Sequence, residues 1–235
     1  MKIALCSDSF IPVVDGVGRV VEQYANTLSR RGHECYVITP TQKTGYRGAL
    51  PYEIVDFLSV PVPTAKQYKT GIATLDAHYM ERVRELDFDI VHAHSPAISG
   101  IEAQRIAARR KIPLIGTFHS KYYDDLRRYT HSDVVSQLGV KFVVNFFERC
   151  DETWAVSDHA AETLRSYGYC GDIRVVHNGS SMISPDPAWE RAAREAYGLD
   201  DRPMLLYAGQ IDRKKNVFTV ALAGADGTLT GAFAA

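Results

Sequence analysis

The chain has 235 residues, and its 27 Lys and Arg against 28 Asp and Glu leave a formal net charge of −1. This balance argues against a nucleic-acid-binding protein, which carries a basic patch, and no run reaches the roughly 20 apolar residues that a membrane-spanning helix needs. The four cysteines show no C-x-x-C spacing and the N-terminus leads directly into a strand, so we expect a cytoplasmic protein with reduced thiols and no signal peptide.

The first forty residues predict a βαβ unit. A strand over Lys2–Ser7 leads into a glycine-containing loop, Ser9–Gly18, and then into an amphipathic helix that ends near Arg30 with Gly32 after it. A second strand follows over Glu34–Thr39. Glycines at a helix N-terminus let the backbone approach an anion, and the free N–H groups there favour phosphate.

The glycine loop departs from two known nucleotide-binding patterns. Val21 occupies the third glycine position of the dinucleotide fingerprint, and no acidic residue follows the strand that ends at Thr39. No G-x-x-x-x-G-K-[ST] run occurs, so a P-loop ATPase is not supported. That the two glycines simply make a tight turn remains an alternative.

Apolar runs and helical periodicity alternate along the rest of the first 180 residues, which predicts a doubly wound, Rossmann-like parallel sheet. The expected strands and helices, in chain order, are a strand at Tyr52–Val60, a helix at Thr70–Leu86, a strand at Phe88–Ala93, a helix at Ala97–Arg110, a strand at Pro113–Phe118, a helix at Ser132–Arg149 with a buried apolar face, a strand at Glu152–Val156, a helix at Ser157–Ser166 and a strand at Ile173–Val176.

The carboxyl ends of these strands would place polar loops around one crevice. Ser7-Asp8, His94-Ser95 and Thr117–His119 are three of these loops, and His177–Gly179 is the fourth. His92 and His94 form an H-x-H pair that could hold a metal, but no third ligand is spaced nearby, so a hydrogen-bonded histidine in the crevice is the preferred interpretation.

The composition changes after residue 180. We expect an N-terminal Rossmann-like domain over 1–180, a linker and helix over 181–202, and the first strand and loop of a second domain over 203–216. The tail 217–235 is atypical because its residues are nearly all small and its single charge is Asp226. The second domain is then almost entirely missing.

Six motifs in order resemble glycosyltransferase family 4, a family of retaining enzymes with the two-domain GT-B fold. The matching segments are "KIALCSDSFIPVVDGVGRVVEQYANTLSRRGHECYVITP", "DIVHAHSP", "IPLIGTFHS", "DETWAVSDHAAETL", "IRVVHNG" and "LLYAGQIDRKKN". The resemblance runs from residue 1 to about 216 and implies hexosyl transfer from a nucleotide-diphosphate sugar to a lipid or saccharide acceptor. It implies neither a metal nor a cofactor.

The resemblance also assigns the donor-side residues. Gly16, Val17 and Gly18 would lie against the donor diphosphate, and His119 in "GTFHS" matches the catalytic histidine that contacts the donor sugar. In "GQIDRKK", Lys215 matches the diphosphate-binding lysine, whereas Gln210 stands in place of the family's arginine and carries no charge. The family's pair of glutamates has no match in the tail.

Three further residues, Asp8, His94 and Tyr122, are candidates for the acceptor side of the crevice. A lipid acceptor would bring the protein to the inner face of the membrane as a peripheral partner, although no basic amphipathic anchor is evident. We expect no nucleic-acid partner.

Two function classes stay open, a nucleotide-sugar-dependent glycosyltransferase and a non-catalytic, truncated domain that binds an acceptor. If 217–235 is the native end of the protein, we expect no turnover, because half of the donor site is absent. An α/β oxidoreductase is a third, disfavoured class.

Overall fold

The computed structural model describes residues 1–13, 15–41, 49–62, 65–119, 121–180, 184, 186–199 and 207. The chain divides into two compact units, Met1–Ser180 and Ser181–Ala235. In the second unit the described residues include the helix α7 (Pro187–Ala196), which Asp186 caps by accepting from the backbone N–H of Ala188. The strand expected over 203–208, the loop to residue 216 and the tail 217–235 lie outside the described residues.

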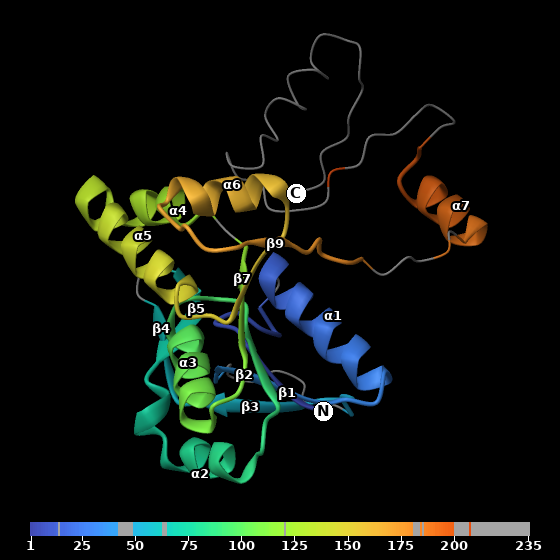
Figure 1. The fold of residues 1–235 in the computed structure, drawn as a ribbon. Coiled ribbons are helices and arrows are strands. Elements are labelled where there is room, and N and C mark those ends of the chain that lie inside the picture. The colour runs from blue at the N-terminus through green and yellow to red at the C-terminus, as the bar shows by residue number, and fades with distance from the viewer. Residues whose placement is uncertain are drawn as a thin grey trace. The chain divides into compact units, whose positions relative to one another are not determined.

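Strands and helices alternate through the first unit, as the apolar pattern predicts (Figure 1). The elements are β1 (Lys2–Cys6), α1 (Gly16–Arg30), β2 (Glu34–Pro40), β3 (Glu53–Phe57), β4 (Ser59–Val62), β5 (Ala65–Gly71), the 3₁₀ helix η1 (Ala73–Leu75), α2 (Ala77–Glu85), β6 (Ile90–Ala93), α3 (Ile98–Arg110), β7 (Leu114–Phe118), α4 (Tyr122–Thr130), α5 (Asp133–Phe147), β8 (Glu152–Ala155), α6 (Asp158–Ser166) and β9 (Arg174–Val175).

Seven strands form one sheet in the order β3-β2-β1-β6-β7-β8-β9, and every neighbouring pair in it is parallel. The chain moves outward from β1 through β2 to β3, then returns to the other side of β1 at β6. The expected doubly wound α/β fold is confirmed. The reversal of strand order between β1 and β6 creates a switch point, where the loops after the two strands diverge.

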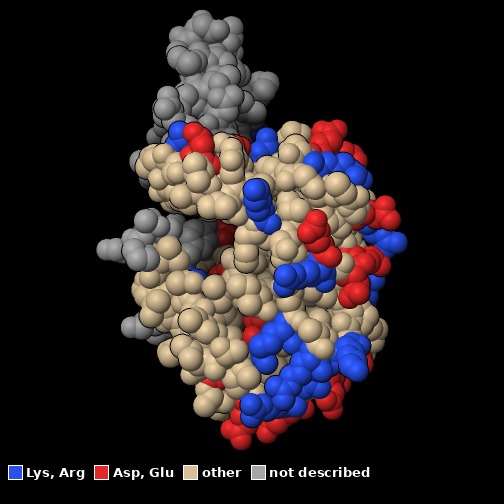
Figure 2. Space-filling view, turned by 60° about the vertical axis from the view of Figure 1, so that its left-hand side comes forward, with Lys and Arg blue, Asp and Glu red and all other residues tan. Residues whose placement is uncertain are grey.

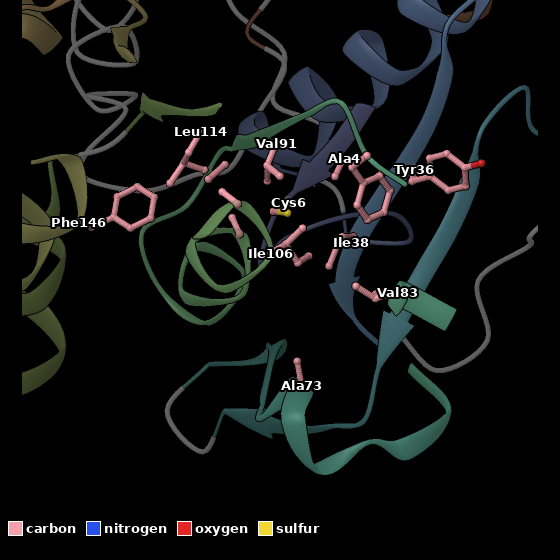
Figure 3. Close-up of a cluster of buried hydrophobic side chains, with 14 of the residues drawn as sticks. Ala4, Cys6, Tyr36, Ile38, Ala73, Val83, Val91, Ile106, Leu114 and Phe146 are labelled. Atoms are coloured by element: carbon pink, nitrogen blue, oxygen red, sulfur yellow. The ribbon is translucent and has the colours of Figure 1, made fainter. Parts of the chain in front are cut away.

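Both faces of the sheet are buried, because alternate residues of each strand serve opposite cores. On β1, Ile3 and Leu5 join a cluster with α1, whereas Ala4 and Cys6 join the larger cluster with residues of α2, α3, α5 and α6. Figure 3 shows part of the larger cluster, in which Ala4, Cys6 and Val91 lie on the side of the sheet that faces α3. The helices thus cover the sheet from two sides (Figure 1).

Two sequence predictions between residues 52 and 86 are wrong. The strand expected over Tyr52–Val60 is split into β3 of the main sheet and β4, which pairs with β5 in an antiparallel hairpin. The helix expected over Thr70–Leu86 begins only at Ala77. Asp76 explains both boundaries, because its carboxylate accepts from the backbone N–H of Tyr79 at 3.1 Å and from that of Leu58 at 2.8 Å.

The apolar face expected to be buried on Ser132–Arg149 is buried only in part. Phe146 and Phe147 lie in the core, but Val135, Leu138 and Phe142 are 45%, 60% and 47% exposed. Helical periodicity identifies an apolar stripe but does not say how much of it another element covers. Among the described residues, none of the helices is long and apolar enough to cross a bilayer.

Arginines gather where α2 and α3 end, and Figure 2 shows basic side chains concentrated on the lower part of one face with acidic ones beside them. Arg110 donates to the carbonyls of Val83 and Arg84, both at 3.0 Å, and to Asp87 at 2.6 Å. Cations at helix C-termini are favoured by the helix dipole, so these charges help to hold α2 against α3.

Gly100 lets the first turn of α3 approach the loop that follows β6. A Cβ there would lie 2.3 Å from the carbonyl oxygen of Ser95 and 2.9 Å from the ring of Phe146. We therefore expect Gly100→Ala to lower the free energy of unfolding by about 1–3 kcal/mol or more in urea titrations. Gly179→Ala is the matched control, since its Cβ meets nothing within 4 Å. Equal stability of both variants would contradict this close approach.

Candidate functional site

The switch point lies between the carboxyl ends of β1 and β6, near the middle of the sheet. The loop after β1 contains the glycine turn, the loop after β6 contains His94, and the neighbouring β7 leads into His119. Open α/β sheets bind their ligands outside the strands at such a point. The predicted residues of the first unit are therefore brought to one edge of the sheet.

The glycine turn is held by Asp15, which is the N-cap of α1. Its carboxylate accepts from the backbone N–H of Gly18 at 2.7 Å and from the hydroxyl of Ser9. Of the three predicted phosphate-binding residues, Gly18 therefore already has a partner for its N–H. Among the described residues, the N–H groups of Gly16 and Val17 have no acceptor, as expected for the first turn of a helix.

Asp15 lies within the first of the six motifs, but its role as the cap of α1 was not predicted from the sequence. An aspartate directly before a helix is a preferred N-cap, and this preference was the available signal. The rest of the loop is anchored by Phe10, which is fully buried and packs edge-on against Tyr52 with ring centroids 6.1 Å apart. The backbone that presents Gly16 is thus fixed from both sides.

Three imidazoles form a stack across β6 and the end of β7. The ring centroids of His92 and His94 are 4.0 Å apart, and those of His94 and His119 are 5.3 Å apart in a stacked arrangement. His94 Nδ1 and His119 Nε2 share a hydrogen bond of 3.1 Å, while His92 Nε2 lies 2.7 Å from the hydroxyl of Thr117. His92 and His94 are hydrogen-bonded, as the preferred interpretation of the H-x-H pair expects, and both are buried, whereas their place in a ligand crevice stays a prediction.

Burial keeps these imidazoles uncharged. It lowers the pKa of His92 to about 3, that of His119 to about 4 and that of His94 well below its usual value. The Asp15 carboxylate opposes this effect on His119 by raising its pKa. The glycine turn and His119 both follow strand carboxyl ends, those of β1 and β7, at the same end of the parallel sheet.

Asp8 has a structural task at this edge. Its carboxylate accepts from the hydroxyl of Ser95 and from the backbone N–H of Ser99, the latter at 2.8 Å. Ala97, the N-cap of α3, offers no side-chain hydrogen bond, so Asp8 supplies the cap from the loop after β1. Burial raises the pKa of Asp8. Contact between Asp8 and an acceptor stays a prediction.

Tyr122 opens α4 and packs edge-on against Phe118, with ring centroids 5.5 Å apart. Burial and, secondarily, the charge of Asp8 raise the pKa of the Tyr122 hydroxyl. The placement of Tyr122 on the acceptor side stays a prediction. Gln210 and Lys215 lie outside the described residues.

These features define a class of protein, namely a Rossmann-like α/β domain with a doubly wound parallel sheet and polar loops at its switch point. The profile described as Glycosyltransferase Family 4 matches residues 14–181, which is more than half of the chain. The chain belongs to glycosyltransferase family 4.

Two curated relatives illustrate the range of the family. The chain is 26% identical over 233 residues to the alpha-monoglucosyldiacylglycerol synthase of Streptococcus pneumoniae, covering 96% of this chain and 52% of the relative. It is 25% identical over 203 residues to a GDP-mannose-dependent alpha-mannosyltransferase of Corynebacterium glutamicum, covering 81% and 48%. The chain thus spans about half the length of these relatives.

A solved chain of sucrose-phosphate synthase from Thermosynechococcus elongatus matches 85% of this chain and 97% of its own length, with a TM-score of 0.48 and 14% identity. A likeness at that level supports no inference about the site.

The uncharged histidines predict a pH dependence of stability. In the unfolded chain these histidines take up protons near pH 6.5. In the folded chain, His119 takes up a proton only near pH 4 and His92 only near pH 3. The free energy of unfolding should therefore fall as the pH drops from 6.5 to 4, by up to roughly 3 kcal/mol for His119 alone. Urea unfolding at a series of pH values measures this slope.

Two variants separate the contributions to that slope. His119→Asn should make the slope shallower, because one proton-binding group is lost from the unfolded chain. Asp8 works in the opposite direction, since its raised pKa favours the folded state as the pH falls. Asp8→Asn should therefore make the loss of stability steeper. A flat profile between pH 6.5 and 4.5 would contradict the buried, neutral histidines.

Proposed function

We propose that this chain is the acceptor-side part of a retaining glycosyltransferase that moves a hexosyl group from a nucleotide-diphosphate sugar to a lipid or saccharide acceptor. The observation that carries the proposal is that the glycine turn and His119 follow the carboxyl ends of β1 and β7, which lie at the same end of the parallel sheet beside the switch point. Family membership supports the reaction class.

The names of the relatives suggest the substrates. One is a synthase of a monoglucosyldiacylglycerol and another a mannosyltransferase that depends on GDP-mannose. We therefore infer glucose or mannose as the transferred sugar and favour a lipid acceptor over a free saccharide. In the proposed enzyme, most donor contacts come from the C-terminal domain, where Lys215 would pair with the diphosphate and Gln210 would add only a neutral hydrogen bond.

The chemistry that such an enzyme must perform suits the described edge of the sheet. As the glycosidic bond breaks, the departing nucleoside diphosphate gains negative charge. The N–H groups of Gly16 and Val17, which have no acceptor among the described residues, lie at the positive end of the α1 dipole and would stabilise that charge more in the transition state than in the ground state. The acceptor would attack on the face that the diphosphate leaves, and a phosphate oxygen would take its proton.

Donor binding can be tested without turnover. We expect UDP-glucose or GDP-mannose at high concentration to shift the backbone amide signals of Gly16 and Val17 in ¹⁵N NMR spectra of the chain, while that of Gly179 stays unchanged. Gly16→Val should abolish the shifts with little loss of stability, because a Cβ at this position meets nothing within 4 Å. Unchanged signals for both donors in the wild-type chain would contradict the proposed donor site.

Transfer can be tested with labelled donors and vesicles that contain diacylglycerol. The chain is assayed alone and fused to the C-terminal half of the S. pneumoniae synthase, and label is counted in the lipid phase. His119→Ala should lower the rate by about 100-fold or more, as expected for the loss of a group that contacts the reacting sugar.

The matched control for this assay is His159→Ala, which alters a histidine on α6 whose side chain is 69% exposed. Its rate should equal that of the wild type. If the chain alone and the fusion both fold and bind the acceptor but form no product, the result favours the alternative of a non-catalytic acceptor-binding domain. Full activity of His119→Ala would contradict the role of His119.

A further inference from the structure

The hydrogen bond between His94 and His119 contains a single proton. Both imidazoles are uncharged near neutral pH because burial disfavours their cations. Each neutral ring carries one N–H and one bare nitrogen, so the bond between His94 Nδ1 and His119 Nε2 has two possible directions. Either His94 donates from Nδ1, or His119 donates from Nε2.

The surroundings of the other ring nitrogen of His94, Nε2, distinguish the two directions of this hydrogen bond. His94 Nε2 is buried and has no hydrogen-bond partner among the described residues. If His119 donated, the proton of His94 would have to sit on this nitrogen as a buried donor without an acceptor. Buried donors without partners are rarer in folded proteins than buried acceptors without partners, so the proton belongs on Nδ1.

We propose that His94 is a positioning residue that donates its Nδ1–H to His119 Nε2 and thereby holds His119 as the tautomer protonated on Nδ1. The neighbouring rings fix the orientation of the donor. His92 stacks on His94, and the Tyr24 ring packs edge-on against both of them, with centroids 5.4 Å from His92 and 5.3 Å from His94. A buried ring held in this way cannot turn to offer a different nitrogen.

This tautomer limits what His119 can do. Its bare nitrogen is occupied by His94, so the ring offers substrate a hydrogen-bond donor at Nδ1 and no basic lone pair. His119 then binds an oxygen of the transferred sugar and does not accept the proton of the attacking hydroxyl. This consequence for the sugar rests on the proposed function, whereas the tautomer itself does not.

The test is ¹⁵N NMR of the chain with labelled imidazoles, in which long-range couplings distinguish Nδ1–H from Nε2–H. We expect a single Nδ1–H tautomer for His119 at pH 7. In His94→Phe, His119 should show a mixture of tautomers, and its pKa should rise above about 4, because a hydrogen bond to the neutral form is lost. The other groups that act on the charge of His119 are His92 and Asp15.

Two further variants show whether the effect is specific. His94→Asn places an amide donor near the position of Nδ1 and should restore the single tautomer. Tyr24→Phe leaves the hydrogen bond in place and should not change it. An Nε2–H tautomer of His119 in the wild-type chain would overturn the proposal, and this measurement does not depend on whether any variant folds. An unchanged tautomer in a folded His94→Phe variant would overturn it as well.

The experiment contains no substrate, so its outcome is independent of the proposed function. If His119 shows the Nδ1–H tautomer but the amide signal of Gly16 does not shift with nucleotide sugars, only the transferase proposal is refuted. A donor response at Gly16 together with an Nε2–H tautomer would refute the role of His94 alone.

Discussion

The Asp8 carboxylate joins the loop after β1 to the start of α3, and the arrangement of the loops at the switch point depends on this junction. It accepts hydrogen bonds from Ser95 and from Ser99, which lie on the far side of the switch point. Burial raises the pKa of Asp8, and the hydrogen bonds from Ser95 and Ser99 oppose part of that rise. His94, next to Ser95, therefore keeps a fixed distance from the loop that contains Gly16.

Asp15 does for α1 what Asp8 does for α3, and both aspartates belong to the segment between β1 and α1. One loop thus caps the two helices that flank the switch point. The arrangement places carboxylates near the site where we propose a diphosphate, and the charge that acts on His119 is that of Asp15. Since like charges repel, the proposed diphosphate needs cations, and the proposal assigns this task to Lys215.

The sequence predicts the parallel sheet well, because strands that are buried on both faces read as short apolar runs such as Lys2–Ser7. The sequence predicts the ends of strands and helices poorly where a hydrogen bond from a residue distant in the sequence determines them. Asp76 binds the backbone at the break between β3 and β4 through Leu58 and starts α2 through Tyr79, and periodicity does not contain these contacts.

The same distinction holds for the site. The strand ends place His119 and His94 at one edge, as topology requires, but their shared hydrogen bond depends on the register between β6 and β7, which pairs His92 with Ile115. The capping roles of Asp8 and Asp15 depend likewise on which backbone N–H each carboxylate reaches. No local pattern in the sequence specifies these distances.

The two glycines of the turn differ in what the fold requires of them. A Cβ on Gly18 would lie 3.2 Å from the Asp15 carboxylate and 3.4 Å from the carbonyl oxygen of Ser9, so packing around the cap explains that glycine. Gly16 has open space around it and no left-handed backbone, so neither packing nor conformation requires glycine there. What a side chain at Gly16 would obstruct is the approach of a ligand to the start of α1, and this makes Gly16 the stronger of the two indications of a bound anion.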